Sequence, residues 1–592
     1  MKIMKIRYII LLAAVALSLS SCKDFLDKET DTRVQLNNAE QLRMLMVDAY
    51  PSSNYGILGE MSSDNVIDNN APTDAGVRYN LNAYNRNDDE LFAWEDCRSE
   101  SGSDSPSAVW EAFYHSIAVC NAVLEKVADL EAQGAQDDLL RAVKGEALLV
   151  RAYSHFILVN LFSMPYGEPN FNKPGIPYIT APEKTVVVHY ERGTVKETYD
   201  KIEADLVEGL PLISDSYYEV PKFHFNKAAA NAFAAKFYLF KREYDKVLQY
   251  TDAVFGGPNV DPSPYMTDLW AQDDLHYLDD IGRYFTNTNQ QHILMVISTY
   301  STAARHYSGQ RRYTCNGLAR RGTVQGPGPS WVQEPFSYSG GGESFAMHPS
   351  FASQLFVSGN QEYGVWFGAA VGEQFEYTDK IAGIGYAHIV RAELTAEDVL
   401  LMRAEAKAFL GDIDGAFADL SVWEKARRNV TATNYLRYMR DFTKDNIVSF
   451  YNEFEAKYEA NKDRRSELAE KYSKEIGYAI ALPLHIDDVC PSDKYHVTPE
   501  NRPYLQCVLQ FRRMDNVHNG TRWFDIRRYG LSLVHRIGRS GQEVVLQTND
   551  PRYALQIPNE VAAAGLERNV RDATVNEPKK DEFVKSVVTV KE

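Results

Sequence analysis

The feature that most constrains the fold is the stretch of residues 144–167, which is apolar on nearly every side of a predicted helix. Strong helix formers fill its first half, and Pro165 followed by Gly167 marks its end. Three polar side chains interrupt the apolar run at short intervals: Arg151, His155 and Asn160. The run is therefore shorter than the roughly 20 uninterrupted apolar residues that a membrane span requires. Because a helix that is apolar all round must be buried, the stretch predicts the central helix of a mainly α-helical protein.

The size and charge of the chain narrow the classes of partner. Its 592 residues are enough for one large globule with insertions or for several separate cores. The hydrophobic fraction of 44% is that of an ordinary globular protein. A formal net charge of -18 argues against nucleic acid, whose phosphates require a basic surface, and against simple adhesion to anionic lipids. Neutral ligands are compatible with this composition.

The N-terminus carries the features of a bacterial export signal. Basic residues precede an apolar segment, residues 9–19, which ends in small residues followed by Cys22. The sequence Leu19-Ser-Ser-Cys22 resembles a lipobox, which implies that residues 1–21 are a signal peptide and that Cys22 is acylated. Each buried methylene group of an acyl chain contributes about 0.8 kcal/mol, so several chains hold a protein at a membrane without a spanning helix. The mature chain then comprises residues 22–592.

The remaining cysteines do not form a recognisable framework. Their number is odd, their positions are widely scattered, and no pair has the spacing of a CxxC metal or redox motif. We expect mostly buried free thiols, with at most one or two disulfides among them: Cys97, Cys120, Cys315, Cys490 and Cys507.

Helical patterns recur on both sides of the central stretch. A first helix is predicted near residues 39–50, closed by Pro51. Thr194 with Glu197 three residues later predicts a capping box at the start of another helix. Residues 401–420 place small side chains where two helices would touch, which is similar to a tetratricopeptide helix pair. We therefore predict a tetratricopeptide-like helical scaffold folded into a single globule.

The composition changes between about residues 257 and 390. This segment is rich in Gly, Pro, Tyr and Ser, and it contains short β-type runs such as residues 293–299. We predict a ligand-binding insertion of loops and small hairpins at residues 257–390. It separates an N-terminal helical part, about residues 23–256, from a C-terminal helical part, about residues 391–592. Loops held by a rigid frame are frequent places for binding residues.

Several phrases along the chain resemble the SusD/RagB family, the outer-membrane nutrient-binding lipoproteins of Bacteroidetes. They stand in the family's order and cover nearly the whole chain: Trp110-x-x-x-Tyr-x-x-Ile-x-x-x-Asn121, Gly145-Glu-Ala, Arg151-Ala-Tyr, Pro165-Tyr, Gly520-x-Arg-Trp-x-Asp-x-x-Arg528 and the ending near Pro558. The resemblance implies an α-rich, tetratricopeptide-like fold that performs no catalysis. It also implies a SusC-like TonB-dependent transporter as the partner, and a place at the cell outer membrane surface with Cys22 as the lipid anchor.

Aromatic residues in two predicted loops are the candidate ligand contacts. Sugar rings present flat C–H faces and hydroxyl groups, so aromatic planes and polar side chains such as Asn and Arg bind them. In SusD-like proteins with a known glycan site the stacking aromatics come from these two regions, which implies the region but not the individual residue. The early loop offers Asn82, Tyr84, Asn85 and Trp94, and the insertion offers Tyr300, Arg305, Trp331 and Tyr338.

Sequence motifs do not nominate a catalytic, metal or cofactor site. The chain has no Gly-x-Ser-x-Gly elbow, no Gly-Lys-Ser/Thr phosphate loop and no His-Glu-x-x-His zinc helix. Its 81 acidic residues guarantee close pairs, so a pair of carboxylates alone cannot nominate a glycosidase. We interpret the phrase Arg522-Trp523-x-Asp525 as structural. Capture of a glycan is the first hypothesis, capture of a peptide or another nutrient by a RagB-like lid is the second, and a surface glycosidase is the third.

Overall fold

The structure is a computed structural model of the chain, and its described residues make a mainly α-helical protein with small sheets, as predicted. The predicted signal peptide, Cys22 and Tyr338 lie outside the described residues. No helix in the described part is long and apolar enough to cross a bilayer. The described ranges are 36–71, 80–97, 102–185, 188–267, 278–307, 311–315, 319, 326–331, 371–427, 439–461 and 482–571.

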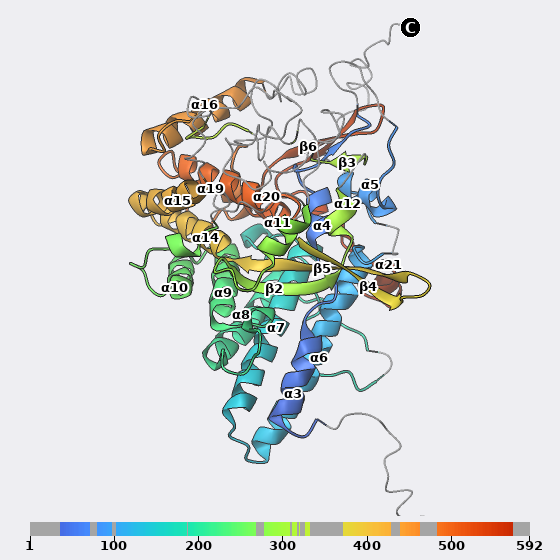
Figure 1. Ribbon diagram of the computed structural model, residues 1–592. Helices are drawn as coiled ribbons and strands as arrows, with labels where there is room; N and C mark the ends of the chain where they lie inside the picture. The colour runs from blue at the N-terminus through green and yellow to red at the C-terminus, as the bar shows by residue number, and fades with distance from the viewer. Residues whose placement is uncertain are drawn as a thin grey trace, which may run out of the picture.

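The central apolar stretch forms α7 (Asp138–Phe162), which confirms the prediction of a buried central helix. Every residue from 145 to 162 is buried. α7 packs against α6 (Pro106–Ala132), α8 (Val195–Gly209) and α3 (Ala39–Leu45). Figure 1 shows α3, α6 and α7 running together to the lower end of the molecule.

Local sequence signals fix where these helices begin. The Thr194 side chain accepts a hydrogen bond from the Glu197 N–H, and the Glu197 side chain accepts one from the Thr194 N–H, so the predicted capping box is confirmed. α6 begins after Ser105, whose hydroxyl caps the helix, with Pro106 in its first turn. The helix predicted near residues 39–50 is also confirmed, as α3 followed by a 3-10 helix, η1 (Met46–Ala49).

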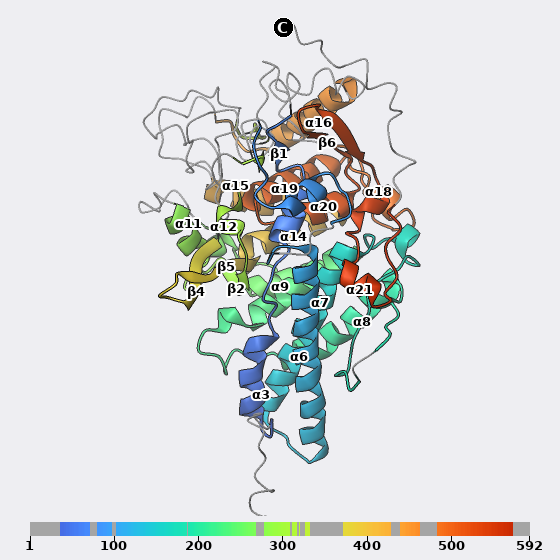
Figure 2. The same cartoon turned by 90° about the vertical axis from the view of Figure 1, so that its right-hand side faces the viewer.

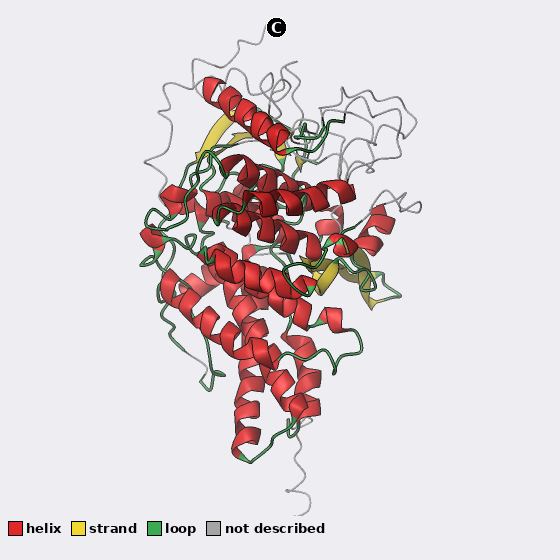
Figure 3. Cartoon of the chain, turned by 90° about the vertical axis from the view of Figure 1, so that its left-hand side faces the viewer, coloured by secondary structure: helices red, strands yellow, loops and turns green. Residues whose placement is uncertain are grey.

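The C-terminal half adds helices that pack directly on the N-terminal ones. α14 (Ala396–Phe409) and α15 (Ile413–Arg427) form the predicted helix pair, and α14 also contacts α10 and α19. Figure 3 shows helices through the whole height of the molecule and strands at its periphery. The other helices are α4 (Gly56–Met61), α5 (Arg86–Phe92), α9 (Lys227–Lys241), α10 (Tyr244–Phe255), α11 (Leu278–Phe285), α12 (Ala303–His306), α16 (Lys444–Asn461), α18 (Ile486–Val489), α19 (Arg502–Asp515), α20 (Arg522–Tyr529) and α21 (Asn559–Ala563).

The sheets are small and antiparallel, with pairs β1-β3 and β6-β7 and a three-stranded sheet of order β2-β5-β4. The predicted β-type run at residues 293–299 is confirmed as β2. β5 continues past residue 390 and leads directly into α14, so this part of the insertion is continuous with the C-terminal helices. The strands are β1 (Ile67–Asp68), β2 (Ile293–Tyr300), β3 (Tyr313–Thr314), β4 (Val371–Asp379), β5 (Ile384–Thr395), β6 (Leu533–Ile537) and β7 (Gln542–Leu546).

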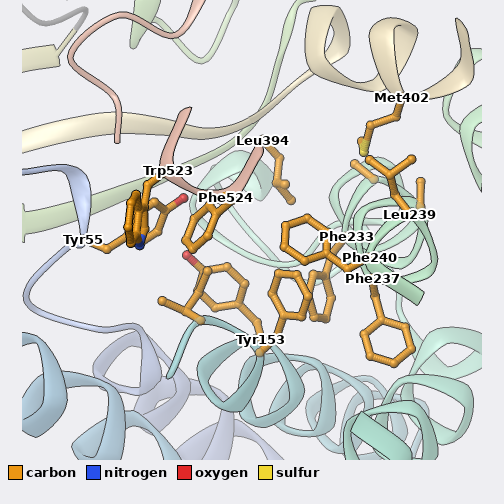
Figure 4. Close-up of a cluster of buried hydrophobic side chains, with 14 of the residues drawn as sticks. Tyr55, Tyr153, Phe233, Phe237, Leu239, Phe240, Leu394, Met402, Trp523 and Phe524 are labelled. Atoms are coloured by element: carbon orange, nitrogen blue, oxygen red, sulfur yellow. The ribbon is translucent and has the colours of Figure 1, made fainter. Parts of the chain in front are cut away.

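An aromatic cluster fills the core between α7, α9 and α20. Figure 4 shows Phe233, Phe237 and Phe240 of α9 gathered beside Tyr153 of α7 and Phe524 of α20. The Tyr153 and Phe233 ring centroids are 5.7 Å apart in an edge-on arrangement, and those of Phe240 and Phe524 are 6.0 Å apart. Edge-to-face packing of this kind adds about 0.5–1.5 kcal/mol per pair beyond the burial of area.

Buried ion pairs tie different helices together. Arg151 of α7 binds both carboxylate oxygens of Asp205 of α8, with Nε–Oδ2 and Nη2–Oδ1 distances of 2.7 Å. Glu405 of α14 accepts a hydrogen bond from Nη1 of Arg528 of α20 and forms an ion pair with Nη2 of Arg512 of α19, each at 2.9 Å. The two guanidinium groups hold the pKa of Glu405 down to about 2 against the effect of burial. Each of these pairs fixes the packing of helices that are distant in sequence.

The Arg522-Trp523-x-Asp525 phrase has the structural role that we interpreted for it. Arg522 donates from Nε to Oδ1 of Asp64 at 2.9 Å, and Asp525 accepts from Nη1 of Arg512 at 3.0 Å. Trp523 is buried in the core. The phrase therefore joins α20 to the N-terminal part of the chain and to α19.

The five described cysteines are free thiols, which confirms the main expectation for them. Cys97 is partly buried and the other four are buried. Desolvation raises the pKa of the Cys97 thiol to about 12, so it stays protonated and unreactive at neutral pH.

Candidate functional site

Tyr84 of the early loop contacts the insertion. Its ring lies 4.8 Å from the ring of His306 in α12, and the guanidinium group of Arg311 lies over it at 4.9 Å. Tyr84 keeps 37% of its surface exposed. Asn82 is exposed as well, and its carbonyl oxygen accepts a hydrogen bond from the Arg312 N–H at 3.2 Å. The two predicted ligand loops thus touch each other at this point.

Asn85 has a local structural role. It is the N-cap of α5, where its side chain accepts from the Asn87 N–H at 3.1 Å and forms a capping box with Asp88. Oδ2 of Asp88 accepts a hydrogen bond from the Asn85 N–H at 3.0 Å, and its Oδ1 lies 3.0 Å from Nε2 of His306. The side chains of Asp88 and His306 are both buried. The early loop and α12 are therefore held in a fixed relation to each other.

Trp94 and Trp331 are packing residues in this structure, in contrast to the prediction that they contact ligand. Trp94 is 3% exposed, stacks on His535 at 4.0 Å and donates from Nε1 to the Ser62 carbonyl at 3.0 Å. Trp331 is 1% exposed and donates from Nε1 to the Gly326 carbonyl at 2.8 Å. Because both indole N–H groups find carbonyl partners inside the chain, both rings are buried without an unpaired donor. Neither indole offers the open face that stacking on a sugar requires.

Tyr300 and Arg305 bind carboxylates on opposite faces of β4. The Tyr300 hydroxyl donates to Oε2 of Glu376 at 3.1 Å, whereas Nε of Arg305 lies 2.6 Å from Oε1 of Glu373. Side chains alternate along a strand, so Glu373 and Glu376, three residues apart, point in opposite directions. The structure thus separates these two predicted residues, with Arg305 of α12 on one face of the sheet and Tyr300 on the other.

Around Tyr300 the sheet displays side chains that the sequence analysis did not single out. The register pairs Tyr300 with His388, His388 with Gln374, and Glu376 with Tyr386, so all five side chains share one face. The Tyr300 ring centroid lies 5.9 Å from that of Tyr386 and 5.1 Å from that of His388. We call these residues the aromatic face: Tyr300, Gln374, Glu376, Tyr386 and His388.

The aromatic face is open to solvent and partly preorganised. Tyr386 is 61% exposed, and both polar members of the face are exposed. The Ser298 hydroxyl lies 3.1 Å from Nε2 of His388, which orients the imidazole. The hydrogen bond to Glu376 raises the pKa of the Tyr300 phenol, which keeps its hydroxyl protonated. Figure 1 shows the β4–β5 hairpin extending away from the helical body. The face combines ring planes with hydrogen-bonding groups, as recognition of hydroxylated rings requires.

A sequence signal for the missed residues existed but was weak. Residues 384–388 alternate between large and small side chains, Ile-Gly-Tyr-Ala-His, in the way that a strand can, yet they lie in a segment whose composition indicates loops. Tyr300 and Glu376 are 76 residues apart in sequence, and only the pairing of both β2 and β4 with β5 brings them together. The alternation could have indicated the strand, but not its partners.

Acidic and histidine side chains near α18 pair with one another. Nδ1 of His485 lies 3.1 Å from Oδ2 of Asp488, and Nδ1 of His496 lies 3.4 Å from Oδ1 of Asp487. Across the residues that the structure describes, no group of three or more His, Cys, Asp or Glu side chains is placed to hold a metal ion.

Known proteins resemble this chain in its N-terminal sequence and in its fold. A SusD-like family model, described as starch-binding and associating with the outer membrane, matches residues 24–239. No curated protein sequence matches the chain.

Solved structures of SusD proteins share the fold over almost the whole chain. A SusD superfamily protein from Bacteroides thetaiotaomicron is 18% identical, covers 91% of this chain and 100% of its own, and has a TM-score of 0.52. One from Bacteroides fragilis is 15% identical, with coverages of 90% and 99% and a TM-score of 0.52. A SusD-like carbohydrate binding protein from Bacteroides vulgatus is 13% identical, with coverages of 92% and 100% and a TM-score of 0.51. The chain thus resembles the SusD-like family in the sequence of residues 24–239, and it shares the fold of solved SusD superfamily proteins over almost its whole length.

Proposed function

We propose that this protein captures a glycan at the outer surface of the cell and passes it, uncleaved, to a TonB-dependent transporter of the SusC type. The observation that carries the proposal is the aromatic face, where three rings and two polar side chains stand together on one face of the β2-β5-β4 sheet. The description of the matched family, starch-binding and associating with the outer membrane, supports both the ligand class and the location.

The chemistry of the aromatic face suits a sugar chain. A pyranose ring laid on the Tyr386 ring buries apolar C–H surface, which contributes about 25 cal/mol for each Å² removed from water. Its hydroxyl groups can donate to the Glu376 carboxylate and exchange hydrogen bonds with the Gln374 amide. An open face covers only one side of each sugar unit, so the affinity for one unit is small. We therefore propose an oligosaccharide or polysaccharide that contacts several of these side chains at once.

Attachment of the protein at the membrane is proposed to depend on Cys22. Acyl chains on this cysteine would anchor an acidic protein that is repelled by anionic lipid surfaces. The anchor and the transporter together would place the captured glycan beside its route of entry.

Binding without cleavage can be tested on the form of the chain that begins at Lys23. This protein is titrated calorimetrically with plant, fungal and host oligosaccharides, and each mixture is then analysed by chromatography. The expected result is saturable binding of one glycan class with the sugar left intact. Appearance of shorter products would overturn the non-catalytic proposal. Binding of peptides but of no glycan would replace it with the second hypothesis, nutrient capture by a RagB-like lid.

The anchor is tested in cells with Cys22→Ser and the control Cys97→Ser. The proposal predicts that the wild-type and Cys97→Ser proteins incorporate labelled palmitate and fractionate with the outer membrane, together with a cross-linkable TonB-dependent transporter. Cys22→Ser should lose both the label and the membrane association. Unchanged labelling of Cys22→Ser would contradict the proposed anchor.

A further inference from the structure

A second concave surface lies away from the aromatic face. A cavity of about 670 Å³ opens between α6, residues 172–183 and 188–193 after α7, and residues 561–567 of α21 and the chain that follows it. In Figure 2, α21 and the β4–β5 hairpin lie on opposite sides of α6. The volume falls within the range of about 300–1,000 Å³ that is typical of small-molecule sites.

One wall of this cavity is aromatic and is fixed without any ligand. Trp110 and Tyr114 lie one turn apart on α6, with ring centroids 4.8 Å apart and ring planes at 41°. Phe162 of α7 packs edge-on against Trp110 at 4.9 Å, and the Tyr114 hydroxyl donates to the Pro177 carbonyl at 2.9 Å. Because these rings are already held in place, a ligand would not have to meet the cost of ordering them.

Arg192 joins the other walls and brings a buried positive charge to the cavity. It is 6% exposed, and its guanidinium group donates to the carbonyls of Gly175, Glu567 and Phe162 and to Oδ1 of Asn569 at 2.7–3.3 Å. Among the described residues no carboxylate oxygen lies within 4.0 Å of it. These contacts use four of the five guanidinium N–H groups and leave one Nη1 hydrogen for another acceptor.

The rim of the cavity is rich in hydrogen-bond acceptors. Glu183, Glu191 and Glu567 line it with exposed side chains, and the Tyr190 hydroxyl donates to Glu183 at 2.5 Å. Three carboxylates against one guanidinium group make the surroundings negative, which disfavours an anionic ligand. Carboxylate acceptors around an aromatic wall suit a ligand with several hydroxyl groups.

We propose that this cavity is a second saccharide site, which takes a short neutral saccharide. One face of the sugar would pack on Tyr114, the partly exposed ring of the wall, which the buried Trp110 supports from behind, and the sugar hydroxyl groups would donate to the carboxylates at the rim. The walls of the cavity can surround a short saccharide on three sides, whereas the aromatic face can contact a saccharide on one side only. The inference rests on the cavity itself and stands or falls independently of the aromatic face.

The test separates the two sites by blocking each in turn. In a Tyr386→Ala background, in which the aromatic face is weakened, the chain from Lys23 is titrated calorimetrically with maltotriose, cellotriose, laminaritriose and xylotriose. Ala564→Trp is then added to fill the cavity, because Ala564 is an exposed residue of its wall. The matched control is Ala563→Trp, since Ala563 is an exposed neighbour that does not line the cavity.

The expected result is saturable binding of at least one trisaccharide that Ala564→Trp weakens at least tenfold and Ala563→Trp changes less than twofold. Glu191→Gln should weaken the same binding severalfold. No binding in the Tyr386→Ala background, or binding that Ala564→Trp leaves intact, would overturn the second site. Preference for a glucuronate trisaccharide over all neutral ones would overturn the ligand class. The change in glycan affinity between the wild type and the single variant Tyr386→Ala reports on the aromatic face alone.

Discussion

The central helix α7 and the β4–β5 hairpin are opposite extremes of the same chain. Every residue from 145 to 162 of α7 is buried, whereas every residue from 374 to 384 of the hairpin is exposed. In α7 the polar side chains of Arg151, His155 and Asn160 have partners inside the protein, as when Asn160 donates to the Phe156 carbonyl at 2.8 Å. Burial and pairing therefore account for its sequence. On the hairpin, exposed rings such as Tyr386 have no such explanation, and exposed aromatic residues that packing does not require are candidates for binding.

The largest predicted loss of stability is at Glu405, a buried charge of the helical body. Glu405→Ala leaves Arg512 and Arg528 without their shared carboxylate, so it should lower the free energy of unfolding by about 3–5 kcal/mol. The control is Glu453→Ala, which removes an exposed pair with Lys457 and should cost at most about 0.5 kcal/mol. Urea unfolding followed by circular dichroism measures both. Equal, small losses would show that the buried network does not hold the body together.

Trp331 tests whether a buried aromatic residue of the insertion belongs to the body or to the ligand surface. Trp331→Ala should lower the free energy of unfolding by about 3–5 kcal/mol, since it leaves a cavity beside Phe511. Glycan affinity per folded molecule should stay within twofold of the wild type. An unchanged urea midpoint together with lost glycan affinity would show that Trp331 contacts the ligand.

Substitution of Gly145 tests how closely α7 packs against the chain around residues 209–212. A Cβ at this position would lie 2.7 Å from Cβ of Leu212 and 3.0 Å from the carbonyl oxygen of Gly209. Gly145→Ala should therefore destabilise by about 1–3 kcal/mol, although alanine favours a helix more than glycine does. The urea midpoint measures the change. Gly134→Ala is unsuitable as a control because Gly134 has a positive φ, so Ala142→Gly, elsewhere on α7, serves to measure helix propensity. Stabilisation by Gly145→Ala would refute the close approach.

The last predicted effect is a dependence of stability on pH that arises from α7. Burial lowers the pKa of His155 to about 3, from 6.5 in the unfolded chain. The unfolded state therefore binds a proton that the folded state refuses, so the free energy of unfolding falls as the pH drops from 6.5 towards 3. The limiting slope is about 1.4 kcal/mol per pH unit. Stability curves of wild type and His155→Gln should converge as the pH is lowered, and parallel curves would contradict this.

The helical body could be predicted from the sequence because its signals are local. The Thr194 and Glu197 capping box, the apolar run of α7 and the small residues of α14 each act within a few turns of helix. The ligand surface could not be predicted in the same way. Whether Trp94 is buried depends on His535 and Ser62, which are distant in sequence, and the grouping of Tyr300 with Tyr386 depends on strand register.

The central claim is that the exposed aromatic face of the hairpin holds the glycan. The most direct test compares Tyr386→Ala with Tyr377→Ala, because Tyr377 is also exposed but lies on the opposite face of β4. Titration of both variants with the glycan that binds the wild type should show about a tenfold loss of affinity, near 1.4 kcal/mol, for Tyr386→Ala only. Urea midpoints of both variants should match the wild type. A larger loss for Tyr377→Ala, or for Tyr84→Ala beside α12, would place the ligand on the other side of the sheet and contradict the account.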